Sequence, residues 1–220
     1  MGKMSLKIQV FNSGPIDNNV ILLCDEETKQ GIIFDPSFDP DLVLKVINDQ
    51  KISVGTILFT HGHFDHFAGL AYLLTKLTPP PKVGLHRGDL KIWQEGGGSI
   101  QFRIPIDLPP DPDLMLEHGQ QVRIGEQYIE VRHTPGHSPG SVIFYIPSIN
   151  TAVVGDLIFK QGIGRTDLEG GSYPELANSI TTQVYSLPAE TILIPGHGPE
   201  TTVGDEQKYN PYVGKNARFL

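Results

Sequence analysis

Several features are rare or missing in this sequence of 220 residues, and each absence removes a class of protein. A single cysteine, Cys24, excludes an internal disulfide and any zinc site made of several thiolates. No apolar run is long enough to cross a bilayer, and the first residues lack both a signal peptide and a myristoylation signal. Lys and Arg form no block and the formal net charge is −8, which argues against nucleic acid as a partner. We therefore expect a cytoplasmic protein with neither a membrane nor a nucleic-acid partner.

The composition that remains is that of an ordinary folded protein. Hydrophobic residues make up 39% and charged residues 19% of the chain, and the length is sufficient for one sizeable core. We expect a single domain that spans residues 1–220. Cys24 ends an apolar run typical of a buried strand, which favours a small core side chain over a reactive thiol.

Short apolar segments separated by turn residues predict two halves with a similar order of strands and helices, without a repeat at the residue level. The expected strands are residues 7–11, 20–24, 31–34, 54–59, 121–124, 128–132, 142–146, 151–154 and 191–194. The expected helices are residues 39–48, 66–77 and 174–185. Residues 95–113, rich in glycine and proline, are expected to form one long loop, either a lid or a plain connector.

Three of the eight histidines fall in one short run, His61-Gly-His-Phe-Asp-His66, directly after a strand that is apolar throughout. His137, Asp156 and His197 each follow another predicted strand and have a glycine neighbour. The ends of strands are where α/β proteins commonly place chemistry, and small neighbours let such side chains approach one point. We interpret these residues as metal ligands.

The spacing within the run indicates two metal positions. In an extended segment, residues two apart point the same way, so His61 and His63 can bind one ion. Where the chain turns into a helix, Asp65 and His66 are directed toward a second position. Seven nitrogen and oxygen ligands exceed the four of a tetrahedral zinc, so we expect two divalent ions with Asp156 between them. These ligands suit zinc first, and also iron or manganese.

Three of the candidate ligands have a simpler interpretation when each is taken alone. Asp65 could cap the helix that follows, His137 could bind backbone within its loop, and His197 could belong to a turn between two glycines. Their joint placement favours the metal site. We expect packing or surface roles for the histidines outside this group, which are His86, His118 and His133.

Two adjacent ions would define the chemistry of such a site. They lower the pKa of a bridging water from about 16 toward about 7. The hydroxide then attacks a carbonyl that one ion polarises, while the other ion holds the leaving group. Asp65 is the catalytic candidate, because a carboxylate beside the bridge can orient the hydroxide. A Gly-x-Ser-x-Gly motif is missing, so we expect no covalent intermediate.

Four motifs, Thr60-His-Gly-His-Phe-Asp-His66, Thr134-Pro-Gly-His137, Gly155-Asp156 and Gly196-His197, resemble the metallo-β-lactamase superfamily over nearly the whole chain. The resemblance implies an α/β fold, a four-layer αββα sandwich of two mixed sheets flanked by helices. It also implies a first metal on three histidines, a second metal on three further ligands and one shared carboxylate. These are His61, His63 and His137, then Asp65, His66 and His197, with Asp156 shared.

A second set of motifs is similar to the short glyoxalase II-like hydrolases, which act on hydroxyacylglutathione thioesters. These motifs are residues 155–159, 162–171, 195–201 and 210–212. In glyoxalase II a basic residue at the position of Arg165 contacts glutathione, which makes Arg165 the substrate-binding candidate, with a loop ion pair as the alternative. Asp167 stands where those enzymes place a tyrosine, and the chain ends at Leu220, before their helical extension. Asp35 remains available to support the ligands.

The expected activity is hydrolysis of a small thioester such as S-lactoylglutathione. One alternative is a mononuclear-iron glutathione persulfide dioxygenase, a family that shares Gly-Arg-Thr-Asp but follows its last histidine with Asp-Tyr, where Gly198-Pro199 stands here. Another alternative is hydrolysis of a different small ester or lactone. Cleavage of β-lactams is disfavoured by the missing secretion signal, nuclease activity by the acidic balance, and a non-catalytic binding role by the complete ligand set.

Overall fold

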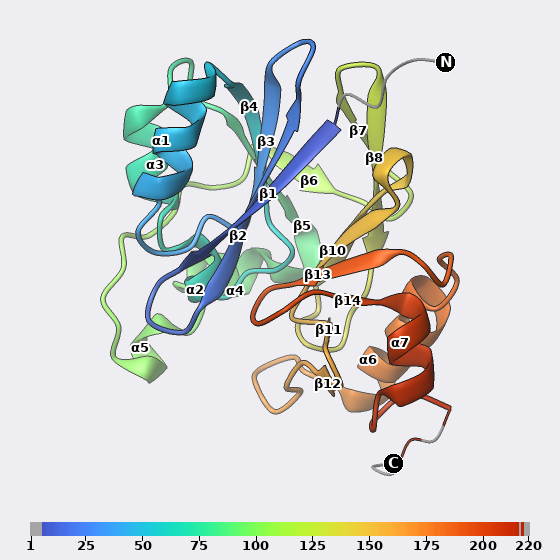
Figure 1. Cartoon of the computed structure of the whole chain (residues 1–220). Coiled ribbons are helices and arrows are strands. Elements are labelled where there is room, and N and C mark those ends of the chain that lie inside the picture. The colour runs from blue at the N-terminus through green and yellow to red at the C-terminus, as the bar shows by residue number, and fades with distance from the viewer. Residues whose placement is uncertain (1–5, 216, 218–220) are drawn as a thin grey trace.

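Two sheets face each other at the centre of the structure, a computed structural model that describes residues 6–215 and 217 (Figure 1). The first sheet has the order β1-β2-β3-β4-β5-β6, antiparallel from β1 to β3 and parallel from β3 to β6. Its strands are β1 (Leu6–Ser13), β2 (Asn18–Asp25), β3 (Gln30–Phe34), β4 (Ser53–Leu58), β5 (Lys82–His86) and β6 (Leu114–Leu116).

The second sheet has the order β14-β13-β10-β9-β8-β7, with one parallel pair, β10 with β13. Its strands are β7 (Gln121–Ile124), β8 (Gln127–His133), β9 (Val142–Ile146), β10 (Thr151–Gly155), β13 (Ile192–Pro195) and β14 (Thr201–Thr202). A small hairpin, β11 (Ile158–Phe159) and β12 (Gly162–Ile163), follows β10. Both sheets are therefore mixed, as expected.

Helices cover the outer face of each sheet (Figure 1). Beside the first sheet lie α1 (Asp41–Gln50), α2 (Phe64–Phe67), α3 (Leu70–Lys76), α4 (Leu90–Gln94) and α5 (Ser99–Phe102). Beside the second lie α6 (Tyr173–Ser179) and α7 (Val203–Tyr209). Short helical turns are η1 (Arg87–Asp89), η2 (Pro147–Ile149) and η3 (Ile180–Val184), the last of which continues α6.

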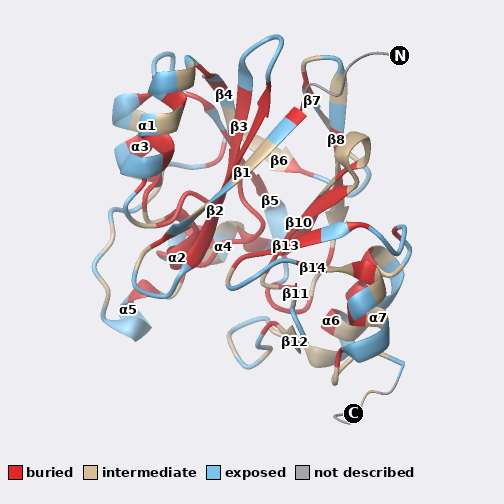
Figure 2. Cartoon of the chain, viewed as in Figure 1, coloured by how far each residue is buried: buried red, intermediate tan, exposed pale blue. Residues whose placement is uncertain are grey.

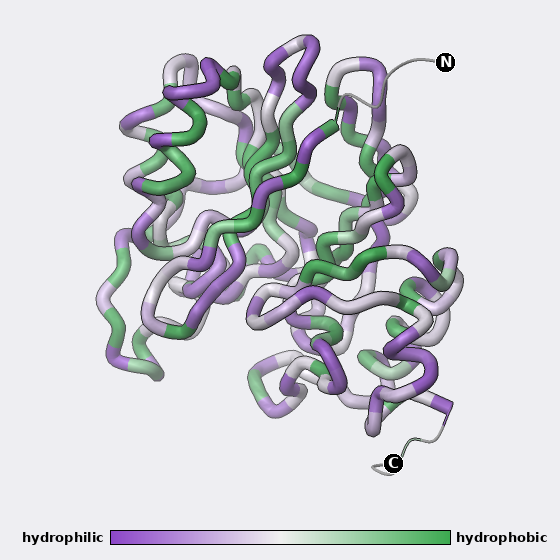
Figure 3. The backbone as a smooth tube through the Cα atoms, viewed as in Figure 1, coloured by the Kyte–Doolittle hydropathy of each residue, from purple (hydrophilic) through white to green (hydrophobic). Residues whose placement is uncertain are grey.

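Three hydrophobic cores hold the layers together, and the alternation of side chains along β2 shows how. Val20, Leu22 and Cys24 point into the core under the first helices, whereas Ile21 and Leu23 point into the core between the sheets. A third core packs the second sheet against α6, η3 and α7. Buried residues and hydrophobic strands accordingly gather in the middle of the molecule (Figures 2 and 3). The four-layer αββα prediction is confirmed, and we propose that these layers form one domain.

Two of the expected elements differ in the structure. The helix expected over residues 66–77 is divided into α2 and α3, because the Gly69 backbone N–H donates to the Pro36 carbonyl and leaves the helical pattern. The segment 95–113 is not one long loop, since α5 interrupts it. Its ends are held to the body: Gly97 accepts from the Phe64 N–H, and Trp93 Nε1 donates to the Pro110 carbonyl.

Within the described part of the chain, no helix is both long and apolar enough to cross a membrane. The N-terminal residues 1–5, where we expect no targeting signal, lie outside the described residues, as does Leu220.

Candidate metal centre

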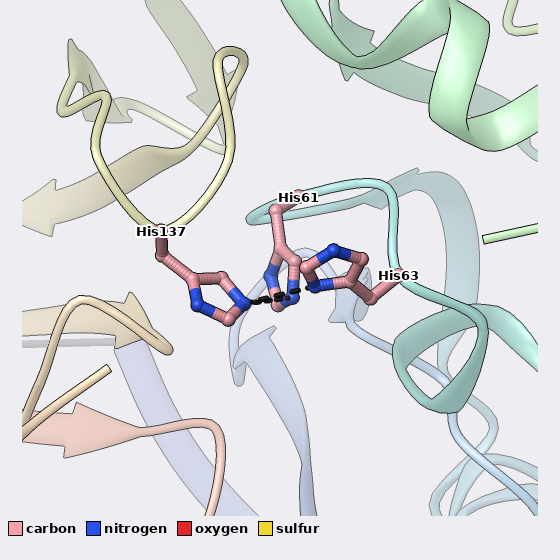
Figure 4. A group of neighbouring side chains, drawn as sticks. All are labelled: His61, His63 and His137. Carbon is pink, nitrogen blue, oxygen red and sulfur yellow. Dashed lines mark hydrogen bonds between the residues drawn. The ribbon is translucent and has the colours of Figure 1, made fainter. Parts of the chain in front are cut away.

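All seven predicted ligands lie together at one edge of the sandwich, and each follows a strand of one sheet or the other. Four come from the segment after β4, one from the loop between β8 and β9, one directly after β10 and one after β13. Figure 4 shows three of them, His61, His63 and His137, pointing toward one another. The structure therefore brings together side chains that are far apart in the sequence.

The first group consists of His61, His63 and His137, all buried. His63 Nδ1 lies 2.9 Å, and His61 Nε2 3.2 Å, from His137 Nε2 (Figure 4). Nitrogens that bind one tetrahedral zinc at its usual bond length are about 3.3 Å apart. The spacing of these three donors thus suits one ion.

Hydrogen bonds behind the first group determine which nitrogens carry protons. The Thr60 hydroxyl donates to Asp35 Oδ2 at 2.6 Å, so its oxygen is left to accept from His61 Nδ1 at 3.0 Å. His137 Nδ1 donates to the Arg165 carbonyl at 2.8 Å. The Nε2 atoms of His61 and His137 then carry no proton, and their lone pairs face each other. A cation bound between them stabilises this arrangement.

Burial favours the neutral form of two histidines of the first group, His61 and His63. Desolvation, followed by the nearby charge of His66, lowers the pKa of His61 well below its usual value. Desolvation, followed by His137, lowers the pKa of His63 to about 3. Neutral imidazole is the form that binds metal, so these side chains are ready to do so at neutral pH.

The second group consists of Asp65, His66 and His197. Asp65 Oδ2 lies 3.2 Å from His197 Nε2 and 3.4 Å from His66 Nε2. The other ring nitrogens donate away from the group, His66 Nδ1 to Asp35 Oδ2 at 3.0 Å and His197 Nδ1 to the Ile16 carbonyl at 2.9 Å. Asp35 therefore supports one histidine of each group, directly or through Thr60.

The charges in the second group shift pKa values in the opposite direction. Burial alone would lower the pKa of His66, but the carboxylates of Asp65 and Asp156 raise it well above its usual value. For Asp65 itself, burial acts to raise the pKa, yet the charge of His66 and hydrogen bonds lower it. The second group is thus an ion-paired cluster, whereas burial lowers the pKa values of His61 and His63 in the first.

Asp156 lies between the two groups. Its Oδ1 is 3.5 Å from His66 Nε2, and its Oδ2 is 3.7 Å from His197 Nε2 and 3.8 Å from His137 Nε2. Asp156 Oδ1 and His66 Nε2 are buried without a hydrogen-bond partner among the described residues. Gly196 permits this approach, because a Cβ there would lie 2.2 Å from Asp156 Oδ1. Buried polar atoms usually have a partner, so Asp156 Oδ1 and His66 Nε2 are free to bind a cation, and the position of Asp156 suits a ligand shared by two cations.

The alternative interpretations of two residues can now be decided. Asp65 does not cap the following helix, because the residue at that position is His63 and its side chain makes no capping hydrogen bond. Arg165 makes the loop ion pair, with its Nε and Nη2 2.7 and 2.8 Å from the two oxygens of Asp167. Its side chain is half exposed and borders the cavity described below, so contact with a substrate stays a prediction.

Two further buried residues, not predicted from the sequence, hold the candidate ligands or their loops in place. Asn18 Nδ2 donates to Asp65 Oδ2 at 2.9 Å, which fixes the orientation of that carboxylate. Asp89 accepts from the Gly62 backbone N–H at 2.8 Å, the Ser138 hydroxyl at 2.6 Å and the Gly140 N–H at 2.6 Å. One carboxylate thus ties the loop of His61 and His63 to the loop of His137.

The sequence carries a weak signal for one of these residues only. Asn18 belongs to a polar pair, Asn18-Asn19, that opens the apolar strand β2, and such polar residues at a strand end are candidates for a site. Asp89 sits in Arg87-Gly-Asp89, which is typical of an exposed turn, although the structure buries its side chain completely.

The remaining histidines and the cysteine lie outside both groups, as expected. The rings of His86 and His133 stack with centroids 4.0 Å apart, and the His133 N–H donates to His118 Nδ1. Cys24 is buried, and this burial raises the pKa of its thiol. These side chains have packing and hydrogen-bonding roles.

A cavity of about 470 Å³ opens beside the metal-ligand candidates. His63, Asp65, His137, Asp156 and His197 line its floor, and residues 95–104 supply much of its wall. The segment expected as a lid or connector is therefore adjacent to the site. A small molecule placed in this cavity would contact both groups of ligands.

The fold and site define the class of protein. The family model for the Metallo-beta-lactamase superfamily matches residues 13–197, and the chain belongs to this superfamily. Two relatives match nearly end to end. One is the "Probable metallo-hydrolase YqgX" of Bacillus subtilis, 36% identical, with 91% of this chain and 94% of the relative covered. The other is the "Hydroxyacylglutathione hydrolase GloC" of Haemophilus influenzae, 30% identical, with 96% and 100% covered.

Two solved structures are similar over nearly their whole length. The BLEG-1 B3 metallo-beta-lactamase is 34% identical with a TM-score of 0.87, covering 94% of this chain and 99% of that one. TTHA1623 in a di-iron-bound form is 35% identical with a TM-score of 0.83, covering 93% and 99%. These similarities agree with a metal-dependent enzyme of the superfamily and leave its substrate open.

Proposed function

We propose that this protein is a metal-dependent hydrolase that cleaves the thioester or ester bond of a small molecule. The observation that carries the proposal is the convergence of seven donor side chains, in which the lone pairs of His61 and His137 face each other at 3.2 Å. Two unprotonated ring nitrogens that face each other in the protein interior raise the free energy of the fold unless a cation binds between them. A hydrolase of the glyoxalase II-like kind is the function that this donor set and the relative named GloC support best.

Two divalent cations fit the donors. We propose that His61, His63 and His137 would hold the first cation. Asp65, His66 and His197 would hold the second, and Asp156 would be shared between them. When bound, such cations supply an acidified water and stabilise charge on the carbonyl oxygen of the substrate. Zinc suits the ligands, and the di-iron form of TTHA1623 supports iron as the alternative, with manganese also compatible.

The residues of the chain have distinct tasks in this reaction. We propose that Asp65, whose carboxylate Asn18 orients, holds the attacking water in position by accepting a hydrogen bond from it. Asp35 and Thr60 hold His61 in the tautomer that presents Nε2. The water oxygen forms a bond to the acyl carbon, the carbon–sulfur bond breaks, and the thiol leaves with a proton. No side chain becomes acylated.

S-lactoylglutathione is the first substrate to test, because GloC is named a hydroxyacylglutathione hydrolase. Arg165 is the candidate contact for a carboxylate of glutathione, and this contact requires that its ion pair with Asp167 opens. The cytoplasmic location expected from the sequence stays a prediction.

The test combines metal analysis with a panel of substrates. Protein purified without added metal is analysed for bound elements, then assayed with zinc, iron or manganese on S-lactoylglutathione, a neutral thioester, a lactone and a β-lactam. We expect two ions per chain and hydrolysis of a thioester, both lost in His61→Ala and kept in His118→Ala. One iron per chain, with oxygen consumed on glutathione persulfide and no hydrolysis, would instead establish the dioxygenase.

A further inference from the structure

The wall of the cavity beside the metal-ligand candidates is largely apolar. Ile92 and Ile104 line it from partly buried positions, and Ile16, Ile100 and Phe102 line it although they are 49%, 82% and 48% exposed. Large apolar side chains left in water at one place are unfavourable unless they contact a ligand or partner. Here they come from two separate segments, the loop after β1 and the helix α5, and meet at one cavity.

This apolar wall begins directly beside the donors. Phe64 stands between His63 and Asp65 in the sequence, and its ring packs against that of Phe102 with centroids 5.5 Å apart. The Phe64 N–H also donates to the Gly97 carbonyl, which holds the wall segment against the ligand loop. A group attached close to the scissile carbonyl would therefore lie on this surface.

The charges around the cavity disfavour an anionic group on the substrate. Among the described lining residues outside the ligand set, the charged side chains are Arg165, Glu95 and Glu169. The guanidinium of Arg165 is bound through two nitrogens to Asp167, and Lys91 just outside pairs with Glu169 at 2.6 Å. Glutathione carries two carboxylates, and neither finds an unpaired cation on this wall.

We propose, on the basis of the hydrolase function above, that the substrate is a neutral thioester with an alkyl chain next to the scissile bond. The chain, on the acyl or the thiol side, lies against Ile100, Phe102 and Ile104 while water attacks the carbonyl carbon. The products are a carboxylic acid and a thiol, and no further reactant is needed. Each methylene buried on this wall raises kcat/KM by about fourfold.

Two series of thioesters test the proposal on the metal-loaded, full-length protein. In one, acetyl, butanoyl and hexanoyl groups are attached to N-acetylcysteamine; in the other, the acetyl group is attached to ethanethiol, butanethiol and hexanethiol. We expect kcat/KM to rise steeply with length in one series, which identifies the side that carries the chain. Equal values along both series would overturn this inference and leave the hydrolase function standing. If neither these thioesters nor any compound of the substrate panel described above is hydrolysed, the hydrolase function itself is refuted.

Variants of the wall provide the second measurement. Ile100→Ser and Phe102→Ser should each reduce the ratio of kcat/KM for the long and the acetyl thioester by roughly fivefold, because less apolar surface is buried. The matched control is Leu108→Ser, since Leu108 is 66% exposed on the same segment but does not line the cavity. A ratio that is unchanged in the first two variants, or that falls in the control, would contradict the assignment of the wall.

Discussion

Thr60 and Asp35 fix the ring orientation and the tautomer of His61. The Thr60 hydroxyl donates a hydrogen bond to Asp35 Oδ2, and its oxygen accepts a hydrogen bond from His61 Nδ1. Thr60 is also anchored by its backbone N–H, which donates to Asp35 Oδ1 at 2.8 Å. Such partners behind a metal-binding histidine fix both its ring orientation and its tautomer.

Replacing the hydroxyl by a methyl group tests these hydrogen bonds. Thr60→Val keeps the size of the side chain but leaves His61 without its acceptor, so we expect metal affinity to fall by roughly 10- to 100-fold. Competition with a chromogenic chelator measures the change. Thr75→Val is the matched control, because the exposed Thr75 hydroxyl only donates to the Tyr72 carbonyl. Unchanged affinity in Thr60→Val would show that the tautomer is held in another way.

The opposite pKa shifts in the two groups predict an order of metal loss with pH. The pKa of His66 is raised, since the carboxylates of Asp65 and Asp156 outweigh burial; the pKa of His197 is raised because its hydrogen bond with Asp65 outweighs burial. Protons therefore compete with metal at the second group as pH falls. His61 and His63, whose pKa values burial lowers, meet no such competition.

We expect the metal content to fall from two ions to one as pH is lowered from about 8 to about 5, with the second group emptied first. Elemental analysis after equilibration at each pH gives the stoichiometry. Calorimetry in buffers of different ionisation enthalpy should detect proton release on filling the second site. Simultaneous loss of both ions would contradict the distinction between the groups.

At the scale of elements, the grouping of the seven candidate ligands could be predicted from the sequence, because the first four stand within one short segment and the others next to glycine after strands. The contacts that support them could not be. Asn18 and Asp65 are 47 residues apart, and Asp89 and Gly140 are 51 apart, so no local pattern records them. The short strands β5 and β6 were also missed, because three to five residues show no clear alternation.

Asp89 connects the loop after β4 to the loop after β8, and we expect this connection to be especially sensitive to substitution. In Asp89→Asn one carboxylate oxygen becomes an NH₂ group that faces the N–H of Gly62 or Gly140, so a buried donor loses its acceptor. The free energy of unfolding should fall by about 1–3 kcal/mol, and metal content should fall with it.

Denaturant unfolding and elemental analysis of the same preparation measure both effects. Asp113→Asn serves as the control, because the exposed Asp113 accepts a single backbone N–H, that of Val83. Loss of stability with full metal content would mean that Asp89 supports the fold without positioning the ligands.

For the whole molecule, the resemblance in the motifs led to the correct four layers, whereas the cavity could not be foreseen. Its wall combines Ile16 after β1, residues 95–104 and Leu168, and only the packed chain brings these segments together. The ligands likewise come from both halves: His61, His63, Asp65 and His66 from the first, and the remaining three from the second. A cation that binds both sets therefore joins the halves of the sandwich.

Removal of the metal should accordingly destabilise the entire chain. A ligand present at a hundredfold excess over its Kd adds about 2.7 kcal/mol to the native state. For a chain of this length that corresponds to roughly 5–10 °C in Tm for each site. We expect a chelator to lower Tm by at least this amount and added metal to restore it. In His197→Ala, which alters the second group only, the chelator should lower Tm by about half as much. In the control His118→Ala it should lower Tm by the full amount. A Tm that does not respond to the chelator would mean that the donors of the two halves are not joined by a cation in solution.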